Sequence, residues 1–106
     1  MEVNFIPQYA FDDCRYIYVL HFDFAIFDGE KLLGLIEYDG KQHFEPVVFF
    51  GGEDGFNKTK KRDQIKNTYC QTHNIPLLRL PYILSMEEIK YKLYKYYLSL
   101  TTAGCA

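Results

Sequence analysis

The sequence predicts an α/β fold of the α+β kind, in which helices flank a mixed central sheet. Two apolar strands, 18–27 and 31–38, are joined by the hairpin signal Asp28-Gly29. A helical pattern and a short apolar strand, 75–80, follow them. The hairpin predicts an antiparallel pair, whereas the strand–helix–strand order favours a parallel crossover onto the same sheet. Together they predict a mixed sheet.

Length and composition describe one folded domain. The chain has 106 residues, of which 48% are hydrophobic and 18% aromatic, enough for one modest core. It has no apolar run of about eighteen residues and no basic-then-apolar start, which predicts no membrane span, no signal peptide and a cytoplasmic location. The formal net charge is −2. Because domains that bind nucleic acid by charge alone are normally basic, a nucleic-acid role would need a local patch, metal ions or a separate binding domain.

The three cysteines are Cys14, Cys70 and Cys105. They are odd in number and far apart, whereas a disulfide framework needs pairs and a zinc site needs closely spaced pairs. We therefore expect reduced thiols, with Cys70 in a structural position on a helix face.

The N-terminal segment predicts an edge strand over 5–11, because its apolar residues alternate and Pro7 cannot donate a ladder hydrogen bond. Asp12-Asp13 then predicts a turn. The next strand, 18–27, has a clear period of two. One face carries Leu20, Phe22, Phe24 and Ile26, and the other carries Val19, His21, Asp23, Ala25 and Phe27.

Asp23 lies in the middle of that aromatic strand, where a carboxylate is costly to bury unless it is paired or binds a metal ion. The following strand, 31–38, is a nearly continuous apolar run, which predicts a central strand buried on both faces. In an antiparallel pair joined by this turn, the sequence positions of two facing residues should add up to about 57–60. Asp23 then faces about Gly34 to Glu37, so the two carboxylates are close enough to share an ion.

Residues 51–55 predict a flexible loop, and Asn57 or Thr59 can cap a helix that runs to about His73. Such a helix begins with a basic run, Lys58, Lys60, Lys61, Arg62 and Lys66. A run of this kind is usually a solvated face. Basic side chains at a helix start oppose the macrodipole, however, which favours an anionic partner.

Asn74 fits a left-handed helix stop, and 75–80 predicts the strand after the crossover. Ser85 and Glu88 have the spacing of a capping box for a last helix. Its predicted inward residues are Met86, Ile89, Leu93, Tyr97 and Leu100. The residues after Leu100 are expected to be a frayed tail.

Four polar side chains are predicted to meet at the carboxyl end of the sheet, where sites form beside helix starts. They are Asp23, Glu37, His43 and Asp63. Two carboxylates suit a hard cation such as Mg²⁺, which stabilises charge on a scissile phosphate and helps to activate water. A neutral His43 can accept the proton of that water, and Asp63 can orient the imidazole.

Three segments resemble the PD-(D/E)XK, or restriction-endonuclease-like, superfamily. They are Phe22-Asp23-Phe24, Ile36-Glu37-Tyr38-Asp39-Gly40-Lys41-Gln42-His43 and Lys61-Arg62-Asp63. The pattern looks most like the branch with the very-short-patch mismatch-repair endonuclease and phage intron-encoded homing endonucleases with an E-D-x-H-D motif. It extends from about residue 5 to residue 82. The resemblance implies a restriction-endonuclease-like core.

Carried over residue by residue, the resemblance implies a role for each of the four side chains. Asp23 and, at the strand end, Glu37 are the metal ligands. His43 is the general base, and Asp63 is the helix-borne acid beside it. The superfamily's usual lysine, two residues after the strand-end acid, is replaced by Asp39, which favours the histidine branch.

The implied activity is that of a Mg²⁺- or Mn²⁺-dependent endodeoxyribonuclease, in particular a homing endonuclease that cuts double-stranded DNA in the cytoplasm of a phage-infected or bacterial cell. Phosphate contacts are predicted for Lys60, Lys61 and Arg62, and a homodimer is compatible with this activity. The superfamily's motif opens with a Glu on a helix before the first strand, and here only Glu2 stands there. Residues 1–106 are therefore expected to be one catalytic domain from a longer protein.

Other interpretations of the same residues stay open. His43 alone is compatible with a structural or surface histidine, Asp63 with an ordinary helix acid, and Glu37 with a simple lysine pair. Asp39 with Gly40 alone is a turn. Two further histidines, His21 and His73, are expected to be structural. The alternative functions are a non-catalytic nucleic-acid-binding or assembly module with the same fold, and an enzyme that cleaves RNA.

Overall fold

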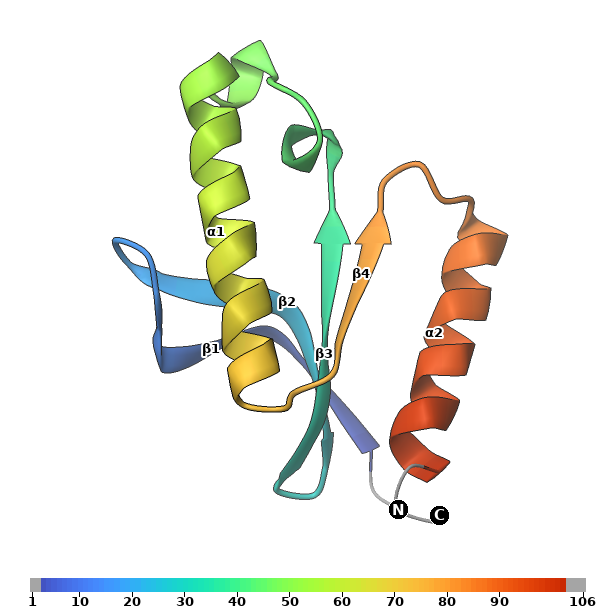
Figure 1. The fold of residues 1–106 in the computed structure, drawn as a ribbon. Helices are drawn as coiled ribbons and strands as arrows, with labels where there is room; N and C mark the ends of the chain where they lie inside the picture. The colour runs from blue at the N-terminus through green and yellow to red at the C-terminus, as the bar shows by residue number, and fades with distance from the viewer. Residues whose placement is uncertain (1–2, 103–106) are drawn as a thin grey trace.

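A computed structural model describes residues 3–102 of the chain. Four strands form one sheet in the order β1-β2-β3-β4, and two long helices lie on its opposite faces (Figure 1). The strands are β1 Val3–Arg15, β2 Val19–Asp28, β3 Lys31–Asp39 and β4 Leu77–Pro81, and the helices are α1 Gly52–Thr72 and α2 Met86–Thr102. Two 3₁₀ turns between β3 and α1 are η1 Lys41–His43 and η2 Val48–Phe50. The prediction of a mixed sheet flanked by helices is confirmed at this level.

β3 is a central strand with a neighbour on each side, as its apolar run predicts. It pairs antiparallel with β2 across the turn at residues 29–30 and parallel with β4. Phe24 faces Ile36, which is within the predicted register. The strand–helix–strand crossover is also confirmed, because β3, α1 and β4 follow one another and the two strands are parallel. Asn74 has the left-handed backbone predicted for the helix stop, with φ of 55°.

β1 is an edge strand, as Pro7 predicts, but it is longer than expected. Asp12 and Asp13 do not form a turn. Both lie inside β1, and the chain reverses at residues 16–18. The Asp13 carboxylate accepts a hydrogen bond from the Tyr69 hydroxyl at 2.7 Å, so this acid connects the strand to α1.

The alternation of β2 changes phase in the middle of the strand, and the predicted faces are wrong for this reason. Phe22 and Ala25 belong to one buried cluster under α1, whereas Ile26 belongs to a second cluster under α2. On the neighbouring strand β1, Gln8 has a left-handed backbone with φ of 52°. Its neighbours Pro7 and Tyr9 pair with Phe24 and Phe22, the residues on either side of Asp23. The irregularity therefore falls at Asp23, where a strict period of two fails.

α1 begins at Gly52, well before the predicted cap residues. The predicted loop over 51–55 is wrong, because Gly51 takes a left-handed conformation with φ of 91° and the helix starts directly after it. Glu53 and Asp54 occupy the first turn, where acids favour the macrodipole. The basic run lies further along the helix, so the expected conflict with the macrodipole does not arise.

α2 begins with the predicted capping box. The Ser85 N–H donates to Glu88 Oε1 and the Glu88 N–H donates to Ser85 Oγ, both at 3.1 Å. The inward residues that are confirmed are Ile89, Leu93 and Leu100. Met86 is 66% exposed, which corrects its predicted place, and Tyr96 rather than Tyr97 packs against the α2-side core.

Cys14 and Cys70 are free thiols buried in the cluster under α1, which confirms the prediction for these two residues. Burial raises the pKa of the Cys70 thiol to about 11. Glu2, Cys105 and the end of the predicted tail, 103–106, lie outside the described residues. Within residues 3–102, neither helix is apolar enough over a sufficient length to cross a membrane.

Candidate active site

Two buried acids stand at the C-terminal end of β3, the end of the sheet at which both long helices start (Figure 1). Glu37 and Asp39 are 3% and 5% exposed and, being two residues apart on a strand, share the face covered by α1. The Lys66 ammonium from α1 lies 2.9 Å from Glu37 Oε2, and Arg79 Nη1 from β4 lies 2.8 Å from Asp39 Oδ1. Because a buried carboxylate without a partner is costly, these two ion pairs keep the acids stable in the interior.

Asp23 joins the site where β2 and β3 separate. The regular ladder ends at the pair Phe24–Ile36, and two side-chain hydrogen bonds follow it. Glu37 Oε1 accepts the Asp23 N–H at 2.9 Å, and Asp23 Oδ2 accepts the Tyr38 N–H at 2.6 Å. The predicted proximity of Asp23 and Glu37 is therefore present.

The charges around Glu37 are unevenly balanced. Burial raises the pKa of Glu37, the Lys66 ammonium opposes this increase, and the Asp23 carboxylate adds to it. Asp23 is half-buried and forms no ion pair with any residue between 3 and 102. With both acids ionised, the group of Asp23, Glu37 and Lys66 carries one more negative than positive charge.

His43, at the end of η1, faces Asp63 in the middle of α1. Its Nδ1 lies 2.7 Å from Asp63 Oδ2 and 3.5 Å from Asp39 Oδ1. Arg79 Nη1 lies 3.5 Å from Asp63 Oδ1, so one guanidinium contacts both acids. One ligand atom from each of Asp39, His43 and Asp63 lies within 4.8 Å of the others.

The contact with Asp63 defines the roles of the imidazole nitrogens. An ionised carboxylate only accepts hydrogen bonds, so Nδ1 of His43 carries the proton and Nε2 of the neutral ring keeps its lone pair. The hydrogen bond to Asp63 raises the pKa of His43, burial opposes the increase, and the charges of Asp63 and Asp39 add to it. His43 is therefore a base whose protonated form is stabilised.

His43 lines a polar cleft of about 470 Å³ between α1 and the two 3₁₀ turns. The charged residues of its lining are Asp54, Lys58, Arg62, Asp63 and Lys66. Among the predicted phosphate contacts, Arg62 lines the cleft, whereas Lys60 and Lys61 do not belong to the lining. The Lys60 ammonium instead lies over the Phe56 ring, 5.2 Å from its centroid.

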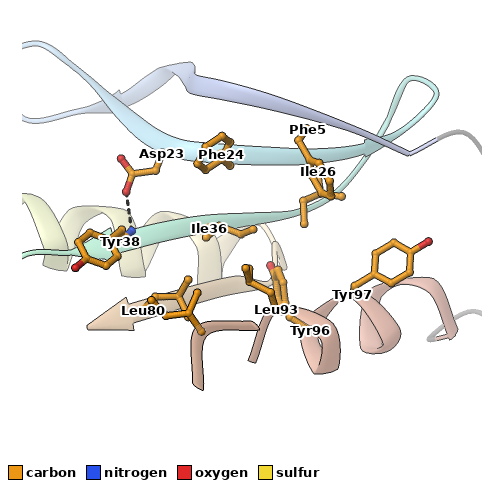
Figure 2. A pocket seen from close by; sticks show the side chains of 11 residues that line it. Phe5, Asp23, Phe24, Ile26, Ile36, Tyr38, Leu80, Leu93, Tyr96 and Tyr97 are labelled. Atoms are coloured by element: carbon orange, nitrogen blue, oxygen red, sulfur yellow. Dashed lines mark hydrogen bonds between the residues drawn. The ribbon is translucent and has the colours of Figure 1, made fainter. Parts of the chain in front are cut away.

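The other face of β3 borders an apolar pocket of about 390 Å³ between the sheet and α2 (Figure 2). Among the described residues that line this pocket, Asp23 is the charged one. Figure 2 shows its carboxylate directed to the Tyr38 backbone. The aliphatic part of the lining is Ile26, Ile36, Leu80, Ile89 and Leu93. Asp23 thus borders the apolar pocket, whereas His43 and Asp63 border the polar cleft.

The four predicted site residues form two neighbouring pairs rather than one compact group. Asp23 contacts Glu37, and His43 contacts Asp63. Asp39 connects the pairs, because it follows Glu37 on the same face of β3 and lies 3.5 Å from His43 Nδ1. The structure therefore contains both predicted contacts, and it adds a residue between them.

Sequence reasoning missed three residues of the site as contributors: Asp39, Lys66 and Arg79. The signal for Asp39 is its spacing of two from Glu37, which the adjacent Gly40 turn signal obscured. The ion pair of Lys66 with Glu37 agrees with the alternative interpretation that Glu37 pairs with a lysine. Nothing in the local sequence indicates Arg79, whose place depends on the parallel pairing of β4 with β3.

The two remaining histidines lie away from this group. His21 is exposed on β2. The His73 ring lies against Tyr69, with ring centroids 4.2 Å apart. Neither side chain belongs to the group of Asp39, His43 and Asp63.

The fold and the buried acid–imidazole group define an α+β domain with a candidate catalytic edge on its central strand. Over residues 14–96 the sequence matches the family described as "Protein of unknown function (DUF2726)", and the chain belongs to this family. It is also 43% identical over 56 residues to "Uncharacterized protein 094L" of Frog virus 3 (isolate Goorha). That match covers 51% of this chain and 36% of the viral protein, so the chain spans about a third of that relative's length. No solved structure matches the chain.

Proposed function

We propose that this chain is the catalytic domain of a metal-dependent DNA endonuclease that hydrolyses phosphodiester bonds. The observation that carries the proposal is the hydrogen-bonded His43–Asp63 pair on the wall of a cleft lined by three cationic side chains. The cations suit a phosphate, and the imidazole suits a base for water. Membership of the PD-(D/E)XK superfamily, and of its homing-endonuclease branch, is part of the same proposal.

The proposed ion is Mg²⁺ or Mn²⁺, held by Asp23 and Glu37. These carboxylates offer the hard oxygen ligands that such ions prefer, and their group has an excess negative charge. The group around Asp39 fits an ion less well, because Nδ1 of His43 carries a proton there and the Arg79 guanidinium contacts both acids. A bound ion would stabilise charge on the scissile phosphate and lower the pKa of a bound water.

His43 is the proposed general base. Asp63 holds Nδ1–H, which leaves Nε2 to accept a proton from the attacking water. The Arg79 guanidinium contacts Asp39 and Asp63 and donates to the Asp63 carbonyl at 3.4 Å, so it positions the two acids around the ring. These residues act as a base and its support, not as ion ligands.

Lys58 and Arg62 are the proposed phosphate contacts, because both line the cleft with His43. Lys66 also lines the cleft, and its ammonium lies beside Glu37 at 2.9 Å, with its charge close to the proposed ion. A lysine from α1 thus stands near the strand-end acid whose usual lysine is replaced by Asp39. Spacing along the sequence does not reveal this position of Lys66, because Lys66 belongs to α1 and Glu37 belongs to β3.

The test is cleavage of supercoiled plasmid by the purified chain with Mg²⁺ or Mn²⁺. His43→Ala and Asp23→Asn should each lower the rate by about 10²–10⁴-fold, the contribution typical of one positioned catalytic group. Asp12→Asn, which removes an exposed acid on β1, should cut like the wild type. If the two site variants cut as fast as the wild type, the proposal is wrong. Parallel assays on DNA and RNA duplexes separate the two substrates.

A non-catalytic nucleic-acid-binding module is the second candidate. It is favoured by the ion pairs of Glu37 with Lys66 and of Asp39 with Arg79, which neutralise the buried acids without a metal ion. Titration with Mn²⁺, followed by calorimetry, separates the two candidates. The endonuclease should show a site that Asp23→Asn abolishes, whereas the module should show none.

A further inference from the structure

The turn between His43 and α1 exposes three consecutive apolar side chains. Val48, Phe49 and Phe50 form η2 and are 94%, 89% and 53% exposed. Single exposed apolar residues are common on protein surfaces, but a contiguous exposed group usually marks a contact surface. This turn is therefore a candidate contact surface for a ligand or partner that covers aromatic rings.

The turn is held in place by its backbone rather than by side-chain burial. The Phe50 N–H donates to the Val47 carbonyl at 2.9 Å, and the Gly52 N–H donates to the same carbonyl at 3.0 Å. The Phe49 and Phe50 rings meet edge to face with centroids 5.4 Å apart. The rings are thus presented in a defined position, with the outer one almost fully accessible.

The position of the turn indicates what covers it. Phe50 lines the same cleft as His43, Lys58 and Arg62, so an aromatic ring directly adjoins the cationic wall. Cationic groups pair with phosphates, and flat aromatic rings pair with the faces of bases that are not in a duplex. The two kinds of group side by side are complementary to a nucleotide that has left its base pair.

A second ring pair involves the residue next to His43. Phe44 follows His43 directly, and its ring lies 5.7 Å from that of Tyr82, the residue after β4. Phe44 is 51% exposed. Aromatic rings therefore follow the proposed base both directly and at η2, as expected for stacking positions along a strand.

Charge gives an independent reason for stacking. The cleft has three cations, of which Lys66 is already paired with Glu37, and two acids, while the whole chain has a net charge of −2. Phosphate contacts alone give a domain of this charge little affinity for nucleic acid. Base stacking adds affinity that does not depend on charge.

We propose that η2 is a base-stacking element, and that the substrate of the endonuclease proposed above is single-stranded or locally unpaired DNA. The inference rests on that proposed function and names its substrate class. Phe49 is the outer stacking ring, and Lys58 and Arg62 contact the adjoining phosphates. A regular duplex offers no exposed base face to this turn.

The test measures binding by fluorescence anisotropy without divalent ions, using a labelled oligothymidine, an abasic strand of equal length and a duplex. The oligothymidine should bind most tightly, and Phe49→Leu should weaken its binding about tenfold, equivalent to about 1.4 kcal/mol and within the range for one stacked base. Phe49→Leu keeps an apolar side chain but removes the ring. Tyr94→Ala, an exposed aromatic of α2, should bind like the wild type.

The outcomes separate this inference from the function on which it rests. Equal affinity for the oligothymidine and the abasic strand, or no effect of Phe49→Leu, overturns the stacking role. Absence of binding to all three probes also overturns it and assigns the turn to a protein partner. Plasmid cleavage without preference for unpaired DNA overturns the substrate class but leaves the endonuclease standing. Stacking through Phe49 without any metal-dependent cleavage overturns the endonuclease instead.

Discussion

The two faces of β3 hold opposite kinds of environment within one strand. Toward α1 lie Glu37 and Asp39, each buried beside a cation, with the imidazole of His43 close by. Toward α2 lie Ile36 and Tyr38, which line an apolar pocket (Figure 2). Ion pairs stabilise the buried acids on the α1 face, whereas apolar contacts line the α2 face.

The difference follows from the alternation of a strand and from what each helix supplies. α1 carries Lys66, which reaches Glu37 of β3, and Asp63, which reaches His43, whereas α2 supplies Ile89, Leu93 and the Tyr96 hydroxyl. Strand geometry alone separates the two chemistries by one residue. The stability of the ion pairs on the α1 face should therefore respond to pH and to charge changes, and that of the apolar packing against α2 should not.

The largest expected effect concerns activity on the α1 face. Asp63→Asn should lower plasmid cleavage by about 10²–10⁴-fold, because an amide that donates to Nδ1 favours the imidazole tautomer whose Nε2 carries the proton. Initial rates at neutral pH measure the effect. Asp12→Asn is the matched control, and a loss of less than about threefold would contradict the orienting role.

The next effect concerns the stability of the same face. Lys66→Met should destabilise the chain by about 3–5 kcal/mol at pH 7.5, because the Glu37 carboxylate stays buried without its cation. The pKa of Glu37 is already raised by burial, so at pH 5 more of it is protonated and the loss should shrink. Urea unfolding at the two pH values measures both changes.

A double variant sharpens that result. Glu37→Gln combined with Lys66→Met removes both charges, and it should recover much of the stability lost in Lys66→Met. The Lys66 ammonium also lies over the Phe22 ring, 5.1 Å from its centroid. An equal loss at both pH values, with no recovery in the double variant, would show that this packing matters more than the ion pair.

A smaller effect is expected on the α2 face. Tyr96→Phe removes a hydroxyl whose single proton faces the Leu35 and Pro76 carbonyl oxygens, at 2.9 and 2.8 Å, and it should cost about 1–3 kcal/mol. Because no ionised group takes part, the loss should be the same at pH 5 and pH 7.5. A strong pH dependence of this loss would break the contrast between the two faces.

The smallest effect is a shift in titration. The pKa of His43 should lie above its ordinary value of about 6.5, and Asp63→Asn should lower it, because the hydrogen bond from Nδ1 to Asp63 is the largest cause of the increase. A raised pKa in the folded chain adds stability below about pH 6.5, and this contribution is lost as pH rises through the folded value. NMR titration of the His43 ring measures the shift, and an unchanged pKa in Asp63→Asn would contradict the assignment.

Much of the frame was predictable because it depends on short-range patterns. The apolar run of 31–38 gave the central strand, and the turn after β2 set the register that brings Asp23 to Glu37. The contact of His43 with Asp63 was also expected from their elements. The roles assigned to these residues in catalysis stay predictions.

What could not be predicted depends on contacts between distant segments. Glycines at 52 and 55 disfavour a helix, yet α1 starts there because the left-handed Gly51 ends the preceding 3₁₀ turn. Arg79 reaches Asp39 only after β4 has paired with β3. Both outcomes are tertiary, and no local window of sequence contains them.

The hydroxyl of Tyr96 has a consequence for the order in which the chain folds. It accepts the Leu35 N–H at 3.1 Å and donates to Pro76, a residue of the connection that leads into β4. A side chain at position 34 would meet this hydroxyl, and Gly34 leaves the space open. The bond to Pro76 requires β4 to lie beside β3, so the complete set of bonds from α2 should form only after the parallel pair has formed. Contacts between residues this far apart in sequence are slow to form, and docking of α2 is expected to be the late step of folding.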